Sequence, residues 1–147
     1  MNQHNLGHTI VAGLVGTLAM TIVMLMAPLM EMPPMPIGNM LAGFMHIPAA
    51  LGWVMHFMIG TILALVYVYL FASRIPGAPI VRGLIYSLLP WFMAQVIVNP
   101  MMGAGVFASH TPAPALFVMG SLIGHLVYGA VLGAVYGLQA ARAVQPA

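Results

Sequence analysis

The sequence predicts an all-α membrane protein, a bundle of four transmembrane helices, from its composition and from the spacing of its few charges. Of the 147 residues, 63% are hydrophobic and only 3% are charged, whereas a soluble domain has about 25% charged residues. The charged residues are Glu31, Arg74, Arg82 and Arg142. Because four charges cannot cover a water-soluble surface, we expect the lipid bilayer to surround this chain.

Four mostly apolar stretches are each long enough to cross a bilayer, which takes about 20 residues in a helix. Segments rich in Pro, Gly or Met separate them, at Met30–Pro48, Ser73–Arg82 and Asn99–Pro114. We therefore expect a single domain over residues 1–147. Its expected transmembrane helices are Gly7–Pro28, Ala49–Ala72, Ile80–Val98 and Ala115–Ala140.

The charges also predict an orientation. With four spans, the three arginines fall on one side of the membrane and Glu31 falls on the other. Lys and Arg are enriched on the cytoplasmic side of membrane proteins, so we expect both termini in the cytoplasm. The segments Met30–Pro48 and Asn99–Pro114 then lie on the outer side.

A pattern of four residues in the second expected helix recurs in the fourth. The residues His56, Gly60, Leu63 and Tyr67 are matched, each 69 positions later, by His125, Gly129, Leu132 and Tyr136. Within each copy the spacing is i, i+4, i+7 and i+11, which places all four residues on one helical face. The pattern predicts two repeated two-helix hairpins, about residues 1–73 and 74–147. Two hairpins of the same orientation would be related by a pseudo-twofold axis along the membrane normal.

The histidines of this repeat, His56 and His125, are the candidate cofactor-binding residues. An ionisable side chain inside a span is costly and by default suggests a function. If the repeated face points inward, both imidazoles approach the axis at similar depth. That geometry would suit two nitrogen ligands of copper or the two axial ligands of haem b. The alternative is structural, with each ring hydrogen-bonded across the bundle to a backbone carbonyl, to Tyr128 or to Gln95.

Methionine is frequent, with 15 residues, and most of them lie toward the outer side in this topology. Thioether sulfur is a soft ligand that selects Cu(I), and imidazole also suits copper. The candidate metal ligands, besides His56 and His125, are Met20, Met24, Met30, Met32 and Met35, with His46 and His110 in the outer segments. The alternative is that methionine fills irregular helix seams as a flexible apolar side chain.

Several classes of function are excluded or disfavoured. The chain has no Cys, which excludes disulfides and Cys-ligated metal clusters. Its net charge of +2 comes without a basic patch, which disfavours nucleic-acid binding. No pair of carboxylates or nucleophile–base set indicates hydrolysis. Metal binding is the leading hypothesis, with copper ahead of haem b. The alternatives are a non-catalytic accessory subunit of a larger respiratory or transport complex, and a homo-oligomeric channel or small-solute carrier lined by Trp91, Gln95 and Asn99.

Three segments resemble a family of small four-helix bacterial membrane proteins. They are GWVMHFMIG at Gly52–Gly60, NPMMGAGVF at Asn99–Phe107 and GHLVYGAVLGAVYG at Gly124–Gly137. The resemblance covers most of the chain and implies a protein of the bacterial inner membrane with four helices. It implies no activity, because the family is known only as a domain of unknown function.

Overall fold

The computed structural model describes residues 5–144, with side chains as far as Leu138. This part of the chain is helical and contains no strand. Its α-helices are α1 (Leu6–Met26), α2 (Ile37–Met45), α3 (Ala49–Val66), α4 (Pro79–Met93), α5 (Asn99–Met101) and α6 (Pro114–Val144). Two 3₁₀ turns, Ala27–Met30 and Val106–Ala108, and two π-helical turns, Tyr67–Phe71 and Ala94–Val98, complete the helical segments.

Among the described residues, four helical segments are long and apolar enough to cross a bilayer, which confirms the predicted all-α membrane fold. They are Leu6–Met30, Ala49–Phe71, Pro79–Met101 and Pro114–Leu138. Large apolar side chains such as Leu18, Ile62 and Leu138 point outward and are 50%, 49% and 63% exposed. A surface of this kind is stable in lipid and unstable in water, because water would have to hydrate it.

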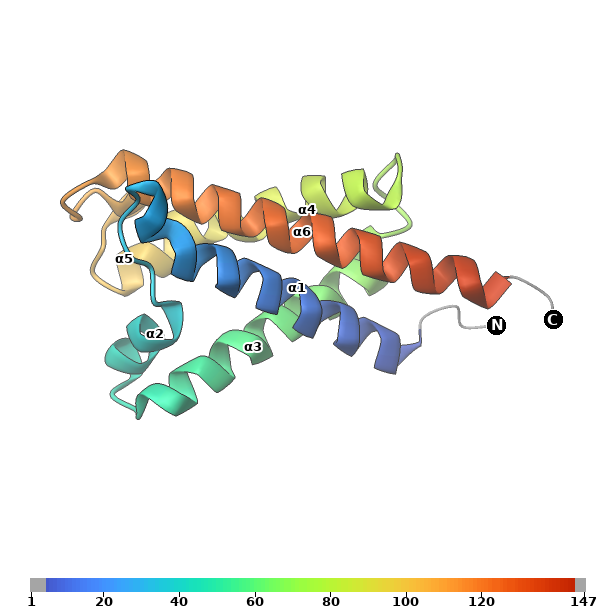
Figure 1. The fold of residues 1–147 in the computed structure, drawn as a ribbon, viewed down its shortest axis with the longest axis horizontal. Helices are drawn as coiled ribbons and strands as arrows, with labels where there is room; N and C mark the ends of the chain where they lie inside the picture. Colours follow the sequence, from blue (N-terminus) through green and yellow to red (C-terminus); the bar gives the residue numbers. More distant parts are fainter. Residues whose placement is uncertain (1–4, 145–147) are drawn as a thin grey trace.

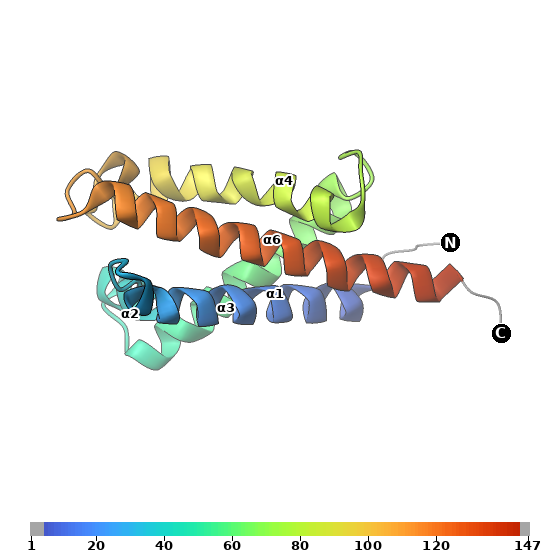
Figure 2. The ribbon, with the colours of Figure 1, turned by 45° about the horizontal axis from the view of Figure 1, so that its top comes forward.

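The long helices lie in two layers, α1 with α3 and α4 with α6 (Figure 2). The helix α1 also packs along α6, so the order of the helices in space is α3, α1, α6, α4. The outer members of this series meet where the Tyr86 hydroxyl of α4 donates a hydrogen bond to the Leu63 carbonyl oxygen of α3, at 2.8 Å. The two layers share a cavity that both outer members border.

Glycine allows α4 and α6 to pack closely. A Cβ atom at Gly129 would overlap the carbonyl oxygen of Gly83, and a Cβ at Gly83 would overlap that of Gly129. In lipid, helices associate through packing rather than hydrophobic expulsion, so small residues at the contact are favoured. Gly60 has the same role in α3, where its Cα faces the side chain of Thr17 in α1. The glycine-rich face of the last helix is therefore a packing surface.

The start of α1, the end of α6 and the turn between α3 and α4 lie at one end of the bundle (Figure 1). The turn carries Arg74, and we refer to this end as the arginine end. The turn with Glu31 joins α1 to α2 at the opposite end, here the α2 end. This separation of charges is the one that the sequence predicted. The side chain of Arg142 lies outside the described residues.

The segment Met30–Pro48, predicted as an irregular connection, contains the helix α2. Its residues Ile37–Met45 pack against the start of α3, and Gly38 lies directly against the ring of Trp53. The helix ends at His46, whose φ of 55° is left-handed. Prolines precede and follow this short helix. Because Pro is typical of loops and turns, the sequence did not predict a helix here.

Some contacts in one hairpin have an equivalent in the other. Gly60 packs on a threonine of α1, and Gly129 packs on Ser87 of α4. Tyr67 and Tyr136, which the repeat pairs with each other, meet edge-on with ring centroids 6.1 Å apart. A contact between equivalent residues is expected close to a twofold axis. The superposition of the two hairpins stays a prediction.

Candidate functional site

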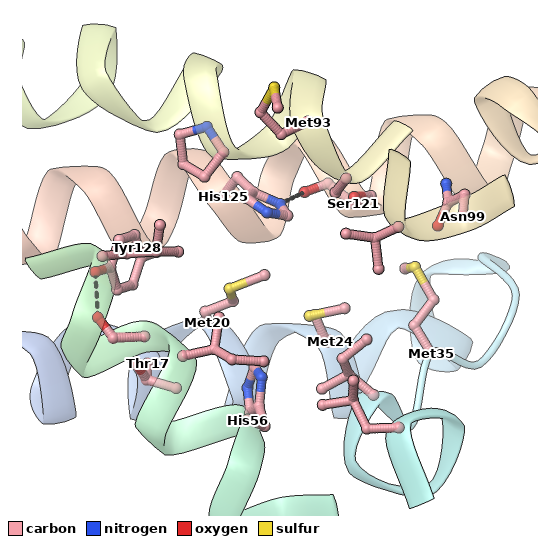
Figure 3. A pocket seen from close by; sticks show the side chains of 18 of the residues that line it. Thr17, Met20, Met24, Met35, His56, Met93, Asn99, Ser121, His125 and Tyr128 are labelled. Atoms are coloured by element: carbon pink, nitrogen blue, oxygen red, sulfur yellow. Dashed lines mark hydrogen bonds between the residues drawn. The ribbon is translucent and has the colours of Figure 1, made fainter. Parts of the chain in front are cut away.

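A cavity of about 340 Å³ lies between the two layers and is bordered by α2. Its wall is largely apolar. The polar side chains that line it are those of Thr17, His56, Asn99, Ser121 and His125, together with Tyr86 and Tyr128. Figure 3 shows that His56, from α3, and His125, from α6, face this space from opposite layers. The predicted inward orientation of both histidines is thus confirmed.

His56 is held by a hydrogen bond to α1. Its Nε2 atom lies 3.0 Å from the Thr21 hydroxyl oxygen, which itself lies 2.7 Å from the carbonyl oxygen of Thr17. A carbonyl can only accept, so the single hydroxyl proton of Thr21 goes to Thr17. The Nε2 atom of His56 must then be the protonated nitrogen that donates to Thr21. Trp53 and Phe57 contact the ring edge-on and help to fix it.

His125 is held by its own helix. Its Nδ1 atom lies 2.7 Å from the carbonyl oxygen of Ser121, one turn earlier in α6. Because this carbonyl only accepts, Nδ1 carries the proton. In the neutral ring, Nε2 therefore keeps its lone pair, and no group in the described part of the chain donates to it. The structural alternative gave each ring a partner across the bundle: a backbone carbonyl, Tyr128 or Gln95. His125 does bond to a backbone carbonyl, but within its own helix, and His56 bonds to Thr21 instead.

A chain of amide hydrogen bonds borders the cavity on the side of α4 and α6. The Asn99 side-chain amide donates to Gln95 Oε1 at 2.9 Å, and Gln95 Nε2 donates to the hydroxyl oxygen of Ser121 at 3.1 Å. Gln95 is fully buried, so these partners satisfy an otherwise costly amide. Trp91, predicted to share this polar face, packs edge-on against Phe107 and does not line the cavity.

Two tyrosines close the cavity toward the arginine end. The Tyr128 hydroxyl donates to the Gly60 carbonyl oxygen at 2.7 Å, and the Tyr86 hydroxyl donates to that of Leu63 at 2.8 Å. Both bonds cross between the layers and use consecutive turns of α3. Because each hydroxyl proton already has an acceptor, these tyrosines can offer a ligand only an oxygen that accepts.

The predicted methionine ligands divide into two groups. Met20, Met24 and Met35 are buried and line the cavity, and Figure 3 shows their side chains between the layers that carry the two histidines. Three further methionines that the sequence analysis did not select also line it: Met40, Met93 and Met102. The cavity is therefore rich in thioether sulfur.

The other four predicted ligands do not reach the cavity. Met30 is 57% exposed, and Met32 packs beside the core near Gly120 without lining the space. His46 and His110 are exposed in the connections at the α2 end, and His110 Nδ1 lies 3.3 Å from the Gly103 carbonyl oxygen. Within the described residues, no three His, Asp or Glu side chains gather as a metal site would require. Any metal at the cavity would need methionine sulfur.

The cavity opens between α3 and α4. Ile59 of α3 and Leu89 and Met93 of α4 line it, yet they are 39%, 46% and 40% exposed. A side chain that both lines a cavity and reaches the surface marks its mouth. These residues lie in two of the membrane-spanning segments, so the mouth faces the bilayer interior.

Sequence reasoning missed the hydroxyl groups of this site. The Thr21 hydroxyl fixes the ring of His56, and the Ser121 hydroxyl fixes the side-chain amide of Gln95. Both hydroxyl-bearing residues are buried. For Ser121 a signal existed, because it precedes His125 by one turn and so shares its face. Thr21 has no such signal, since its contact with His56 depends on how α1 packs on α3.

The comparisons with known proteins define the chain by its family alone. No curated protein and no solved structure matches it. One family model matches residues 3–146, nearly the whole chain, and its description is a family of unknown function, DUF6789. The four-helix membrane fold and its cavity are thus described in a chain that belongs to the DUF6789 family.

Proposed function

We propose that this membrane protein binds a lipophilic small molecule, which reaches the cavity from the bilayer between α3 and α4. The observation that carries the proposal is the cavity itself. It offers about 340 Å³ behind an apolar wall, and exposed apolar side chains of two membrane-spanning segments surround its mouth.

The size and lining of the cavity fit a ligand site. Small-molecule sites measure about 300–1,000 Å³ and combine apolar walls with a few polar groups that orient the ligand. This cavity is at the lower end of that range. The polar side chains of Ser121, His125 and Asn99 lie along one side of it (Figure 3). The proposal therefore concerns a small ligand with an apolar body.

An empty cavity of this size would be costly. Unfilled space costs about 24 cal/mol per Å³ through lost dispersion contacts. This cavity opens between α3 and α4, so an apolar molecule from the bilayer can enter it and restore those contacts. We infer that a guest fills the space in the membrane. The apolar wall favours an apolar guest over water, which needs several polar partners.

A matched pair of substitutions tests the route from the bilayer. Ile59 lines the cavity at its mouth, whereas Ile62, one turn further along α3, is exposed without lining it. The probe is a diazirine-bearing alkane in liposomes that contain the protein, and mass spectrometry locates the labelled residues. Cavity residues such as Met20 should be labelled in the wild type and in Ile62→Trp, and much less in Ile59→Trp. Labelling confined to outward-facing side chains in all three proteins would contradict the proposal.

Cu(I) binding is a second candidate, favoured by the soft ligands around the same cavity. Met20 and Met24 are buried on one face of α1, and His125 Nε2 has a free lone pair. Thioether and imidazole together suit Cu(I). Haem b would use only the lone pairs of the two histidines, at Nδ1 of His56 and Nε2 of His125, and would leave the methionine sulfurs of the cavity without a role. Copper is therefore the metal that we propose for this second function.

For the setting of the protein, we propose the bacterial inner membrane, with the arginine end in the cytoplasm. The support is the positive charge at that end, where Arg74 and Arg82 lie near the turn between α3 and α4. The outward apolar faces are covered by lipid, and a homo-oligomer or a larger respiratory or transport complex would cover part of them. Size-exclusion chromatography with light scattering in a mild detergent, followed by mass spectrometry of co-purified proteins, tests for such partners.

A further inference from the structure

The polar side of the cavity offers a hydrogen-bond acceptor and a hydrogen-bond donor close together. The acceptor is Nε2 of His125 and the donor is the hydroxyl group of Ser121. Both residues line the cavity and lie one turn apart on α6, so they share a helical face. Their roles follow from the bonds that they already make.

The acceptor role of His125 follows from its bond to the backbone. Because Nδ1 donates to the Ser121 carbonyl oxygen at 2.7 Å, the neutral ring has no second proton to offer. Its Nε2 atom can only accept. No donor for Nε2 is found among residues 5–138, whose side chains the structure describes.

The donor role of Ser121 follows from the amide chain. Asn99 donates to Gln95, and Gln95 Nε2 donates to the Ser121 hydroxyl oxygen. The direction of the chain leaves the hydroxyl proton of Ser121 without an acceptor in the described part of the molecule. Since Gln95 is fully buried, it cannot turn to water, and its bond fixes the position of the serine oxygen.

Resting on the proposed binding of a lipophilic molecule, we propose that the ligand carries a hydroxyl group that bonds to both His125 and Ser121. Its O–H would donate to His125 Nε2, and its oxygen would accept from the Ser121 hydroxyl. The class is that of long-chain alcohols and phenols. An ether or a ketone can only accept, so it would leave His125 unpaired. A hydrocarbon would satisfy neither group.

Three probes of equal chain length test this class. They are a diazirine-bearing 1-alkanol, its methyl ether and the parent alkane, each added to liposomes of phosphatidylcholine that contain the full chain. A hydrogen bond contributes a net factor of about five in affinity. The alkanol should therefore label cavity residues such as Met20 about fivefold more than the ether does.

Variants assign the preference to the two groups. His125→Phe removes the acceptor, so it should abolish the advantage of the alkanol over the ether. Ser121→Ala removes the donor, so it should abolish the advantage of the ether over the alkane. Ser87→Ala is the matched control, because Ser87 is buried, bonds within its own helix to Leu84, and does not line the cavity. If Ser121→Ala fails to fold because Gln95 loses its acceptor, His125→Phe alone carries the test.

The outcomes separate this inference from the proposal beneath it. If all three probes label the cavity equally, the space takes lipophiles without selecting a hydroxyl group, and this inference is wrong while the proposed function stands. An advantage of the alkanol over the ether that persists in His125→Phe also contradicts the inference. If none of the probes labels the cavity, the proposed function itself fails.

Discussion

His56 and His125 line one cavity with opposite ring nitrogens protonated: Nε2 of His56 donates to Thr21, and Nδ1 of His125 donates to the backbone of Ser121. The repeat places these residues at equivalent positions, yet their partners differ. His56 is tied to a neighbouring helix, whereas His125 is tied only to its own. The nitrogen left with a lone pair is therefore Nδ1 in one ring and Nε2 in the other.

The first prediction concerns these tautomers. Nitrogen NMR of protein labelled with ¹⁵N-histidine should show one ring protonated at Nε2 and one at Nδ1, as the two hydrogen bonds require. His56→Leu should remove the first set of signals, and His125→Leu should remove the second. Matching tautomers in the two rings would mean that one of the two hydrogen bonds is absent in the membrane.

The second prediction concerns the glycine contact between α4 and α6. Gly129→Ala should destabilise the protein by about 1–3 kcal/mol, the usual effect of overpacking, because its Cβ meets the Gly83 backbone and the Ser87 side chain. Gly43→Ala is the control, because nothing lies within 4 Å of a Cβ there. It should be neutral or stabilising by about 0.5–1 kcal/mol, since Ala favours a helix over Gly. Thermal unfolding in detergent measures both, and equal effects would contradict the close packing.

The third prediction concerns the cross-layer bond from Tyr128 to Gly60. Tyr128→Phe removes only the hydroxyl, which lies 2.7 Å from the Gly60 carbonyl oxygen. Hydrogen bonds between membrane helices contribute about 0.6 kcal/mol on average and at most about 1.7. We expect a loss of stability in this range, measured by unfolding in detergent. A loss above about 3 kcal/mol would indicate that the tyrosine also holds the layers by other means.

The fourth prediction separates the two proposed functions. If Cu(I) binds at the cavity, Met24→Leu should weaken Cu(I) binding about tenfold or more. Loss of an outer-shell partner alone usually weakens metal binding by at least about tenfold, and Met24 would be a direct ligand. Met30→Leu should have no effect, because Met30 is exposed and outside the cavity. Leu is close to Met in volume, so labelling by the alkane probe should survive in both variants. Competition with a chromogenic Cu(I) chelator measures the affinity, and visible absorbance of the purified protein checks for haem.

The fifth prediction concerns orientation. A reporter that is active only in the periplasm, fused after Ala147, should stay inactive, because the three arginines should keep the arginine end in the cytoplasm. The same reporter inserted after Gly103, in the connection at the α2 end, should be active. The reverse pattern would turn the bundle over and place α2 in the cytoplasm.

The four spans were predicted closely from the sequence. A long apolar segment in lipid must form a helix, because only then are its backbone hydrogen bonds satisfied within the segment. The expected Ala49–Ala72 agrees with the observed Ala49–Phe71, for example. The inward direction of His56 and His125 was also predictable, since their helical faces carry glycine. The helix α2 was not, because prolines flank it and its helical stretch is only nine residues long.

The candidate site was only half predictable. Met20, Met24 and Met35 line the cavity, but Met30 ends the 3₁₀ turn after α1, is exposed and does not line it. Side-chain chemistry selected all four, whereas the path of the connecting backbone decided between them. The hydroxyl partner Thr21 could not be predicted, because its role depends on the crossing of α1 and α3.

The π-helical turn at Ala94–Val98 divides the third span, Pro79–Met101, into two segments. Side chains after the turn are rotated about the helix axis relative to where an uninterrupted α-helix would place them. A π turn adds one residue to an α-helix, and one residue corresponds to a rotation of about 100° about the helix axis. Before the turn, Gly83 and Ser87 face α6; from the turn onward, Gln95 and Asn99 reach the amide chain beside the cavity. Without the extra residue the phase would run on unchanged, and the two amides would swing away from Ser121. The single additional residue thus lets the first half of this span pack closely on α6 and the second half present polar side chains beside the cavity.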